Sequence, residues 1–270
     1  MELSDAQFNH FRTFGYLAFP GLFAPEEITW ITEEFETAIQ KVGGEKHNGS
    51  ARTMFLGPID RTEKLCTILD DPRMLGILGG ILGPDFNYCS GDGNYYTGDT
   101  RWHPDGAWGQ IFAIKAAFYL DPVTRDTGCL RVIPGSQDPN HLVRREKIDP
   151  NKAMELFGVE PRDFPGAVAL ETNPGDLVLL NHDTYHSSWG GGTRRRMFTM
   201  NCTRHGHTEE DVALVRKYVS VHTPGAYKVE IGAGMYSPIM LDTASESRRA
   251  HLFQPAALHD ELFPQYARQA

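Results

Sequence analysis

The chain has 270 residues, 40% of them hydrophobic and 11% aromatic, which suffices for one substantial core. Its formal net charge is −9, with 26 Lys and Arg against 35 Asp and Glu, so it lacks the basic surplus typical of nucleic-acid-binding proteins. Its apolar runs are too short to cross a bilayer, and the polar, acidic start MELSDAQFNHF is unlike a signal peptide.

The cysteines are scattered along the chain and form no C-x-x-C pair. They are Cys66, Cys89, Cys129 and Cys202. In a chain of this length the spacing argues against a disulfide framework and against a zinc site built on thiolates. We therefore expect reduced, mostly buried thiols and a cytoplasmic protein.

The first forty residues predict two helices with a short strand between them. Ser4 and Gln7 fit a capping box before phenylalanines at helical spacing, and Gly15 ends this first helix. A strand over Tyr16–Phe19 follows. A proline and two glutamates then open a helix that runs from Pro25 to about Val42.

After a polar loop at 43–52 and one or two short helices within 61–82, the pattern changes to short strands separated by turn signals. The predicted strands are Asn87–Tyr96, Ile111–Leu120, Cys129–Ile133, Ala167–Leu170, Asp176–Leu180 and Met197–Thr203. Residues 140–165 read as an inserted helical segment, and residues 208–220 as a helix.

The order of these elements, with helices first and many short strands after them, predicts one α+β domain over residues 1–270 with a β-sandwich or barrel core. Within it we expect N-terminal helices over 1–85, the β core over about 87–205 and a C-terminal extension over 206–270.

The segment GDTRWHPDGAWG contains the most informative residues of the chain. His103 and Asp105 are two positions apart, so in an extended segment both side chains point to the same side. Pro104 stiffens the pair. An imidazole and a carboxylate suit Fe(II), although H-x-D by itself also occurs in ordinary polar loops.

A third ligand must come from a distant segment, and two histidines compete for that role. His182 ends an apolar run and can be read as a core or edge histidine. His186 precedes two serines and three glycines, so it is expected at a strand end that opens into a cavity. We favour His186, which together with His103 and Asp105 gives a facial triad for catalysis with positions open for substrate and O₂.

A 2-oxoacid bound to iron also needs a cation for its far carboxylate, and guanidinium suits this role. Three arginines precede the last predicted strand. By strand parity Arg195 shares the polar face with Thr199, whereas Arg196 shares an apolar face with Phe198. Arg195 is therefore the first candidate, and Arg196 remains the alternative.

Further candidates follow from sequence proximity to these ligands or from strand parity. Lys115 interrupts an apolar strand, so it either extends to an edge or faces inward and binds an anionic group of the co-substrate or substrate. The other cofactor candidates are Asn94 and Tyr96, and the substrate candidates are Trp108, Gln110 and Tyr119. The alternative for each of these aromatic residues is that it packs in the protein interior and binds no ligand.

These segments together resemble the phytanoyl-CoA dioxygenase family of Fe(II)- and 2-oxoglutarate-dependent oxygenases. WHPDG is similar to the family's WHxD motif, TGCLRVIPGSQ to its G-x-L-x-V-I-P-G-S-H segment, and GDLVLLNHDTYHSS to its GD…H-x-S stretch. The opening AQFNHFRTFGYLAFPGLFAPEEI and the strand RRRMFTMN also match the family's pattern, so the resemblance covers nearly the whole chain.

The resemblance implies a double-stranded β-helix (jelly-roll) core flanked by helices. It also implies iron bound by His103, Asp105 and His186, with Arg195 or Arg196 binding 2-oxoglutarate. The activity implied is hydroxylation of an unactivated C–H bond with O₂, which releases succinate and CO₂. Because Asp105 fills the carboxylate position, halogenation, which needs a small residue there, is not expected.

We expect a small-molecule substrate, no nucleic-acid or membrane partner, and a monomer or homodimer. The absence of a basic patch speaks against an acyl-CoA. Two alternatives remain open at this stage. One is a zinc hydrolase with the same ligands, and the other is a non-catalytic jelly-roll binding protein.

Overall fold

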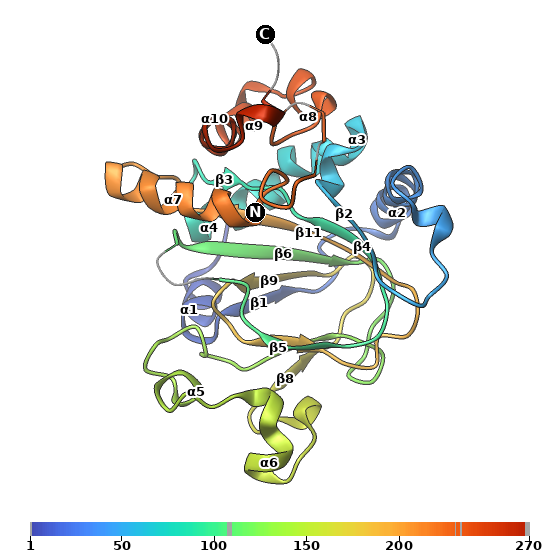
Figure 1. Ribbon diagram of the computed structural model, residues 1–270, viewed down its shortest axis with the longest axis vertical. Coiled ribbons are helices and arrows are strands. Elements are labelled where there is room, and N and C mark those ends of the chain that lie inside the picture. The colour runs from blue at the N-terminus through green and yellow to red at the C-terminus, as the bar shows by residue number, and fades with distance from the viewer. Residues whose placement is uncertain (1, 107–109, 230, 233, 268–270) are drawn as a thin grey trace.

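The computed structural model describes residues 2–106, 110–229, 231–232 and 234–267. Two antiparallel sheets lie one above the other (Figure 1). The larger, seven-stranded sheet has the order β1 (Tyr16–Phe19), β9 (Leu177–Asn181), β6 (Ala113–Tyr119), β11 (Arg195–Thr203), β4 (Asp92–Tyr96) and β2 (Thr53–Leu56), with β3 (Asn87–Tyr88) also paired to β11. The four-stranded sheet has the order β5 (Thr100–His103), β10 (His186–Ser188), β7 (Leu130–Val132) and β8 (Val168–Leu170).

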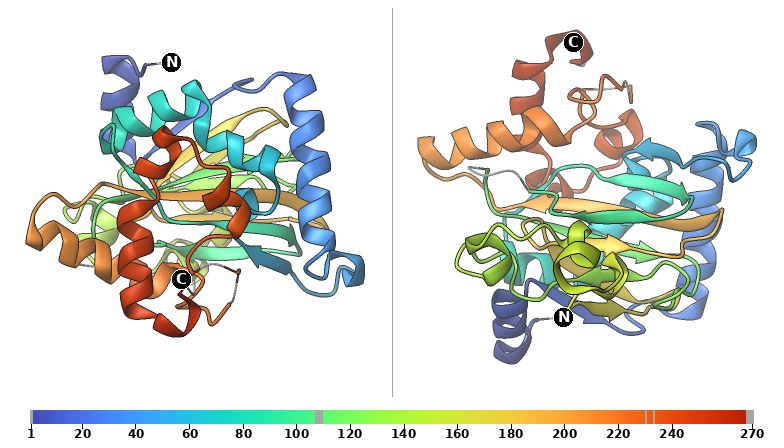
Figure 2. Two further views of the ribbon diagram at one scale, coloured as in Figure 1. Left: turned by 90° about the horizontal axis from the view of Figure 1, so that it is seen from above. Right: turned by 60° about the horizontal axis from the view of Figure 1, so that its bottom comes forward.

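Helices gather on the outer side of the larger sheet, as the view from above shows (Figure 2). They are α1 (Asp5–Phe14), α2 (Pro25–Gln40), α3 (Glu63–Cys66), α4 (Pro72–Leu82), α7 (Glu209–His222), α8 (Pro238–Asp242), α9 (Glu246–Ala250) and α10 (Phe253–Leu262). The short helices α5 (Leu142–Arg145) and α6 (Ala153–Phe157) lie beyond the smaller sheet (Figures 1 and 2).

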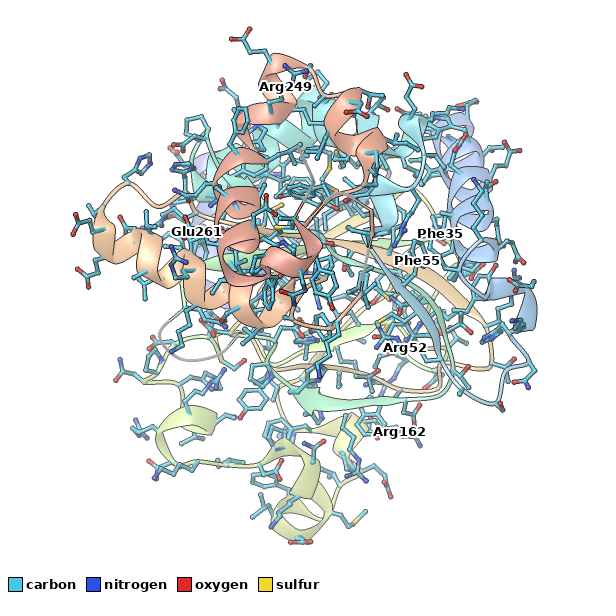
Figure 3. The ribbon with its side chains drawn as sticks, turned by 45° about the horizontal axis from the view of Figure 1, so that its top comes forward. Phe35, Arg52, Phe55, Arg162, Arg249 and Glu261 are labelled. Carbon is cyan, nitrogen blue, oxygen red and sulfur yellow. The ribbon has the colours of Figure 1, made fainter. Side chains whose placement is uncertain are left out.

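The main hydrophobic core lies between these helices and the outer face of the larger sheet. Phe118 of β6 stacks on Phe198 of β11 with ring centroids 4.5 Å apart, and Phe35 of α2 packs against both Phe198 and Phe55 (Figure 3). Such aromatic pairs contribute about 0.5–1.5 kcal/mol each beyond the area they bury. The outer face is therefore fixed by packing, which leaves the inner face available for polar side chains.

The start of the chain folds as the pattern predicts. Ser4 caps α1 through a capping box with Gln7, and Gly15 ends the helix with φ 78°. The helix predicted to reach about Val42 ends at Gln40. The chain thus has N-terminal helices and antiparallel sheets, which is the mixed α+β architecture expected from the order of the elements.

Two features differ from the strand prediction. The single strand expected over Asn87–Tyr96 is interrupted, because Ser90 has φ 70° and breaks the extended backbone into β3 and β4. The strands β2, β5 and β10 were not predicted. The sequences of β5 and β10 are TRWH and HSS. Both are too short and too polar to show the alternation of apolar and polar residues that predicts a strand, and both become strands through pairing with their neighbours.

All four cysteines are buried free thiols. Among the described residues, no helix has both the length and the apolar character needed to span a lipid bilayer.

Candidate active site

A cavity of about 330 Å³ lies between the two sheets. Its walls come from the inner faces of β4, β6, β9 and β11 and from β5 and β10 of the smaller sheet. His222 at the end of α7 and Tyr227 after it also line the cavity, so the segment beyond the β core contributes to the site.

His103, Asp105 and His186 meet in this cavity. Each offers one ligand atom, and these atoms lie within 4.8 Å of one another. The Nε2 atom of His103 is 3.6 Å from Oδ1 of Asp105, and Nε2 of His186 is 3.4 Å from Oδ2. The distant segments that carry the two histidines are brought together because β5 and β10 pair with His103 opposite His186.

The second nitrogen of each ring fixes the orientation of both imidazoles. Nδ1 of His103 donates to the carbonyl of Arg101 at 2.7 Å, and Nδ1 of His186 donates to the carbonyl of Thr184 at 3.0 Å. Since a carbonyl only accepts, the neutral ring must carry its proton on Nδ1. The Nε2 lone pairs therefore face Asp105, an arrangement typical of metal-binding histidines.

Asp105 is held by both its backbone and its side chain. Its amide and that of Gly106 donate to the carbonyl of His182, each at 2.8 Å. The ammonium of Lys115 donates to Oδ2 of Asp105 at 2.5 Å. Burial by itself would raise the pKa of Asp105, but the charge of Lys115 and the two histidines hold this pKa well below its ordinary value. The carboxylate is thus ionised and ready to bind a cation.

The histidines differ in their titration. Burial lowers the pKa of His186 to about 4, so its imidazole is neutral near pH 7. Burial also opposes the charged form of His103, but the hydrogen bond and charge of Asp105 outweigh burial, and its pKa is raised. A cation at the Nε2 atoms would therefore compete with a proton on His103.

A second group of metal-ligand side chains consists of Asp85, His205 and His207. None of these residues lines the cavity, and His207 is exposed and paired with Asp85 at 3.2 Å. The site of interest is therefore the buried group between the sheets.

Arg195 lies further along the same cavity and is 5% exposed. Its Nη1 donates to the carbonyl of Gly128 at 2.5 Å and to Oγ of Ser188 at 2.6 Å, while its Nε has no hydrogen-bond partner within the described ranges. Among the described residues no carboxylate pairs with it. A buried guanidinium without a counter-ion is costly, so this arrangement favours an anionic ligand.

Two glycines make room for this guanidinium. A Cβ on Gly128, whose φ is 95°, would lie 1.8 Å from Nη1 of Arg195, and a Cβ on Gly191 would lie 2.9 Å from it. Larger residues at these positions would displace the side chain from its place in the wall.

Arg196 lies on the other face of β11, because successive side chains of a strand point to opposite sides. There it pairs with Asp121 at 2.5 Å and with Glu36 of α2 at 3.2 Å, and it does not line the cavity. The sequence left Arg196 as an alternative for the co-substrate, but its charge is already neutralised on the helix side of the sheet.

The other predicted residues occupy different places. Tyr96 and Tyr119 line the cavity, and Lys115 does so with its ammonium already paired to Asp105. Asn94 does not line it and instead binds Arg52 and Asp92.

Gln110 contacts His222 and does not line the cavity, and Trp108 lies outside the described residues. Ala117 also lines the cavity.

Sequence reasoning missed several residues of the cavity wall. The signal for Ser188 was its position two residues after His186, but its strand β10 could not be predicted from its short polar sequence. Arg52 on the edge of β2 (Figure 3) and His222 and Tyr227 near the end of α7 could not be found either, because they come from segments outside the predicted core.

Comparison with known proteins agrees with this geometry. The phytanoyl-CoA dioxygenase (PhyH) family matches residues 11–197. The chain is 25% identical over 221 residues to an ectoine dioxygenase of Stutzerimonas stutzeri (strain A1501), which covers 68% of this chain and 70% of that protein.

Solved structures of similar fold include HygX from Streptomyces hygroscopicus with nickel and 2-oxoglutarate bound. Its TM-score is 0.60 at 17% identity, over 77% of this chain and 90% of that one. EctD from S. alaskensis with 2-oxoglutarate and 5-hydroxyectoine gives a TM-score of 0.57 at 18% identity, over 75% and 76%. These likenesses establish the double-stranded β-helix fold, and the family match over most of its length places the chain in the phytanoyl-CoA dioxygenase family of iron- and 2-oxoglutarate-dependent oxygenases.

Proposed function

We propose that this protein hydroxylates a C–H bond of a small molecule, with His103, Asp105 and His186 as ligands of Fe(II) and Arg195 as the group that binds 2-oxoglutarate. The observation that carries the proposal is the position of Arg195. Its buried guanidinium lacks a carboxylate partner among the described residues, and it lines the same cavity as the three metal-ligand side chains.

The donor set fits a ferrous ion. Two neutral imidazole nitrogens and one ionised carboxylate are ligands that Fe(II) prefers, and they leave coordination positions free. Bound there, iron with 2-oxoglutarate and O₂ supplies the oxidising power for hydroxylation, and succinate and CO₂ are the co-products.

The protein's own residues contribute orientation and charge. Arg195, whose guanidinium is held by Oγ of Ser188 and the carbonyl of Gly128, offers a fixed cation to the far carboxylate of 2-oxoglutarate. Lys115 holds one oxygen of Asp105, which orients the carboxylate. The apolar side chains of Leu130 and Met197 contribute to the cavity wall near these charges.

A carboxylate at position 105 supports hydroxylation, because halogenation would need the space that Asp105 occupies. A zinc hydrolase could use the same three ligands with a bound water, but it would leave Arg195 without an anion to bind. The arginine therefore favours the oxygenase over the hydrolase.

The test is anaerobic reconstitution of the protein with Fe(II), followed by 2-oxoglutarate. We expect 2-oxoglutarate to bind only the iron-loaded protein, detected by calorimetry and by the visible absorption that the keto acid develops on ferrous ion. Admission of O₂ should then produce succinate. Arg195→Ala should weaken 2-oxoglutarate binding, whereas Arg196→Ala, on the outer face, should leave it unchanged. Equal binding of 2-oxoglutarate with and without metal would contradict the proposal.

A further inference from the structure

His182 lies just after β9 and is 3% exposed, yet its side chain lines the cavity. Neither of its ring nitrogens has a hydrogen-bond partner among the described residues. Asn201, on the inner face of β11, also lines the cavity, and its side-chain oxygen has no hydrogen-bond partner in the part of the chain that the structure describes. Buried polar atoms in native proteins are nearly always paired, so these atoms point to a ligand.

The backbone of His182, and not its side chain, makes the hydrogen bonds that hold this position in the fold. Its carbonyl accepts from the amides of Asp105 and Gly106, and its amide donates to the carbonyl of Ala113. Among the described residues the ring nitrogens have no hydrogen-bond partner, and the ring lies near Tyr218 and His222, with centroids 5.6 Å and 5.9 Å away. The imidazole is thus positioned next to the metal-ligand group without being used to hold the fold together.

The geometry points to a substrate subsite formed by His182 and Asn201 that binds an uncharged hydroxyl or amide group, and this inference rests on the proposed function. A neutral imidazole offers one donor and one acceptor, while the oxygen of Asn201 only accepts. A hydroxyl can donate to Asn201 or to the free imidazole nitrogen and can accept from the imidazole N–H. A primary amide, with two N–H donors, can donate to both and accept from the imidazole N–H.

Charged groups fit this subsite less well. Asn201 lies directly opposite Lys115 in the pairing of β11 with β6, and the ammonium of Lys115 is already paired with Asp105. Neither an ammonium nor a carboxylate group of a substrate would therefore find an unpaired counter-charge at this subsite. No carboxylate or guanidinium among the described residues pairs with His182, so the subsite itself is neutral.

The outer part of the cavity suggests what the rest of the substrate is. Met54 is 43% exposed and Tyr227 is 52% exposed, and both line the cavity together with the ion pair of Arg52 and Asp92, so the rim offers apolar surface beside paired charges. A molecule with a polar uncharged head and an apolar body would place its head at His182 and its body at this rim.

The test uses one apolar body with four head groups. The probes are cyclohexanol, cyclohexanecarboxamide, cyclohexanecarboxylate and cyclohexylammonium, whose binding to the anaerobic enzyme with Fe(II) and 2-oxoglutarate is measured by ligand-observed NMR. The alcohol and the amide should bind about 3- to 10-fold more tightly than the two charged probes, the effect of one or two hydrogen bonds. His182→Phe and Asn201→Leu should each remove this preference, and His182→Gln should keep part of it.

Thermal unfolding separates this role from a structural one. Because no side-chain hydrogen bond is lost, ligand-free His182→Phe should melt at or above the temperature of the wild type. His251 is a matched control, since it is also 3% exposed but its Nδ1 donates to the carbonyl of Phe86 at 2.7 Å. His251→Phe should lower the melting temperature.

The outcomes are distinguishable from failure of the proposed function. If the visible absorption of 2-oxoglutarate on Fe(II) never develops, the proposed function fails, and this inference fails with it. If that absorption develops in both the wild type and His182→Phe, but the wild type binds all four probes equally, the subsite alone is overturned. A melting temperature of His182→Phe as low as that of His251→Phe would also overturn it.

Discussion

His103 and His186 lie directly opposite each other in the antiparallel pairing of β5 with β10, and their ring centroids are 4.3 Å apart. Their separation therefore depends on backbone hydrogen bonds of the smaller sheet and not on a flexible loop. Both rings are also oriented by their own backbone neighbourhood through Nδ1. The site is preorganised, so removing either ring should affect metal binding far more than folding.

His186→Ala should weaken Fe(II) binding by at least about 10-fold, the effect seen when even a supporting partner of a metal ligand is lost. Titration with Fe(II) under anaerobic conditions, followed by calorimetry, measures this change. His182→Ala is the control, because its ring lies outside the group of ligand atoms. Retained iron affinity in His186→Ala together with loss in His182→Ala would exchange the roles of the two histidines.

Arg195→Lys should raise the 2-oxoglutarate concentration needed for half-maximal turnover by about 10- to 100-fold. Lysine keeps the positive charge but loses the forked donor geometry, and hydrogen bonds to charged groups contribute about 1.5–3 kcal/mol. Arg196→Lys, on the helix side of the sheet, should leave this requirement within about two-fold of wild type. Steady-state succinate formation against 2-oxoglutarate concentration gives both values, and equal effects of the two variants would count against the assignment.

Gly128→Ala should also raise the requirement for 2-oxoglutarate, although residue 128 carries no functional side chain. The added Cβ would lie 1.8 Å from Nη1 of Arg195, so the guanidinium must move. Gly166→Ala is a matched control, since its φ is 82° and a Cβ there has nothing within 4 Å.

Both alanine variants carry the backbone strain of a positive φ, so both should lose stability. Gly128→Ala should lose more, because its Cβ would also lie 2.8 Å from Cα of Gly191, and chemical denaturation measures both losses. A change in 2-oxoglutarate requirement that is equal in the two variants would mean that strain alone, and not displacement of Arg195, causes it.

Lys115→Met should destabilise the metal-free protein by about 1–3 kcal/mol. The ammonium is the partner of Asp105, and losing one member of a partly buried ion pair leaves the other charge uncompensated. Fe(II) should restore more stability in this variant than in the wild type, because the ion supplies the missing positive charge. Denaturant unfolding with and without metal measures the difference, and Lys115→Arg, which keeps the charge, should behave like the wild type.

Asp60 gives a pH dependence that is independent of the active site. Its carboxyl is fully buried, accepts from the hydroxyl of Tyr88 at 3.1 Å, and burial raises its pKa from 3.8 to about 6. Between these values the unfolded chain is ionised while the folded protein keeps the proton. This contribution to stability is therefore fully present below about pH 4 and is lost as the pH rises through 6.

Asp60→Asn lacks this titration but keeps an acceptor for Tyr88. The stability of the wild type relative to Asp60→Asn should therefore fall by up to about 3 kcal/mol between pH 4 and pH 7. Urea unfolding of both proteins across this range measures the difference, and a difference that does not change with pH would mean that Asp60 is ionised in the folded state.

Local chemistry was sufficient to predict the elements that depend on local signals. The capping residues of α1, the left-handed Gly15 and the two faces of β11 follow from neighbouring residues alone. The same is true of His103 and Asp105, since alternation in an extended segment places both on one side. The strands β5 and β10 were not predictable, because their short polar sequences become strands only through pairing.

The sequence by itself determined which residues could form the site: two histidines, an aspartate and an arginine on strand-forming segments. Only the tertiary structure decided between His186 and His182 as neighbours of Asp105, and between Arg195 and Arg196 as the arginine of the cavity. The sequence left Lys115 either at an edge or at an anionic group of the co-substrate or substrate, and the structure pairs it with Asp105. Among the described residues the ring of His182 has no hydrogen-bond partner. The physical reason is that these choices depend on strand register and on which charges meet across the cavity, and neither is encoded in any single segment.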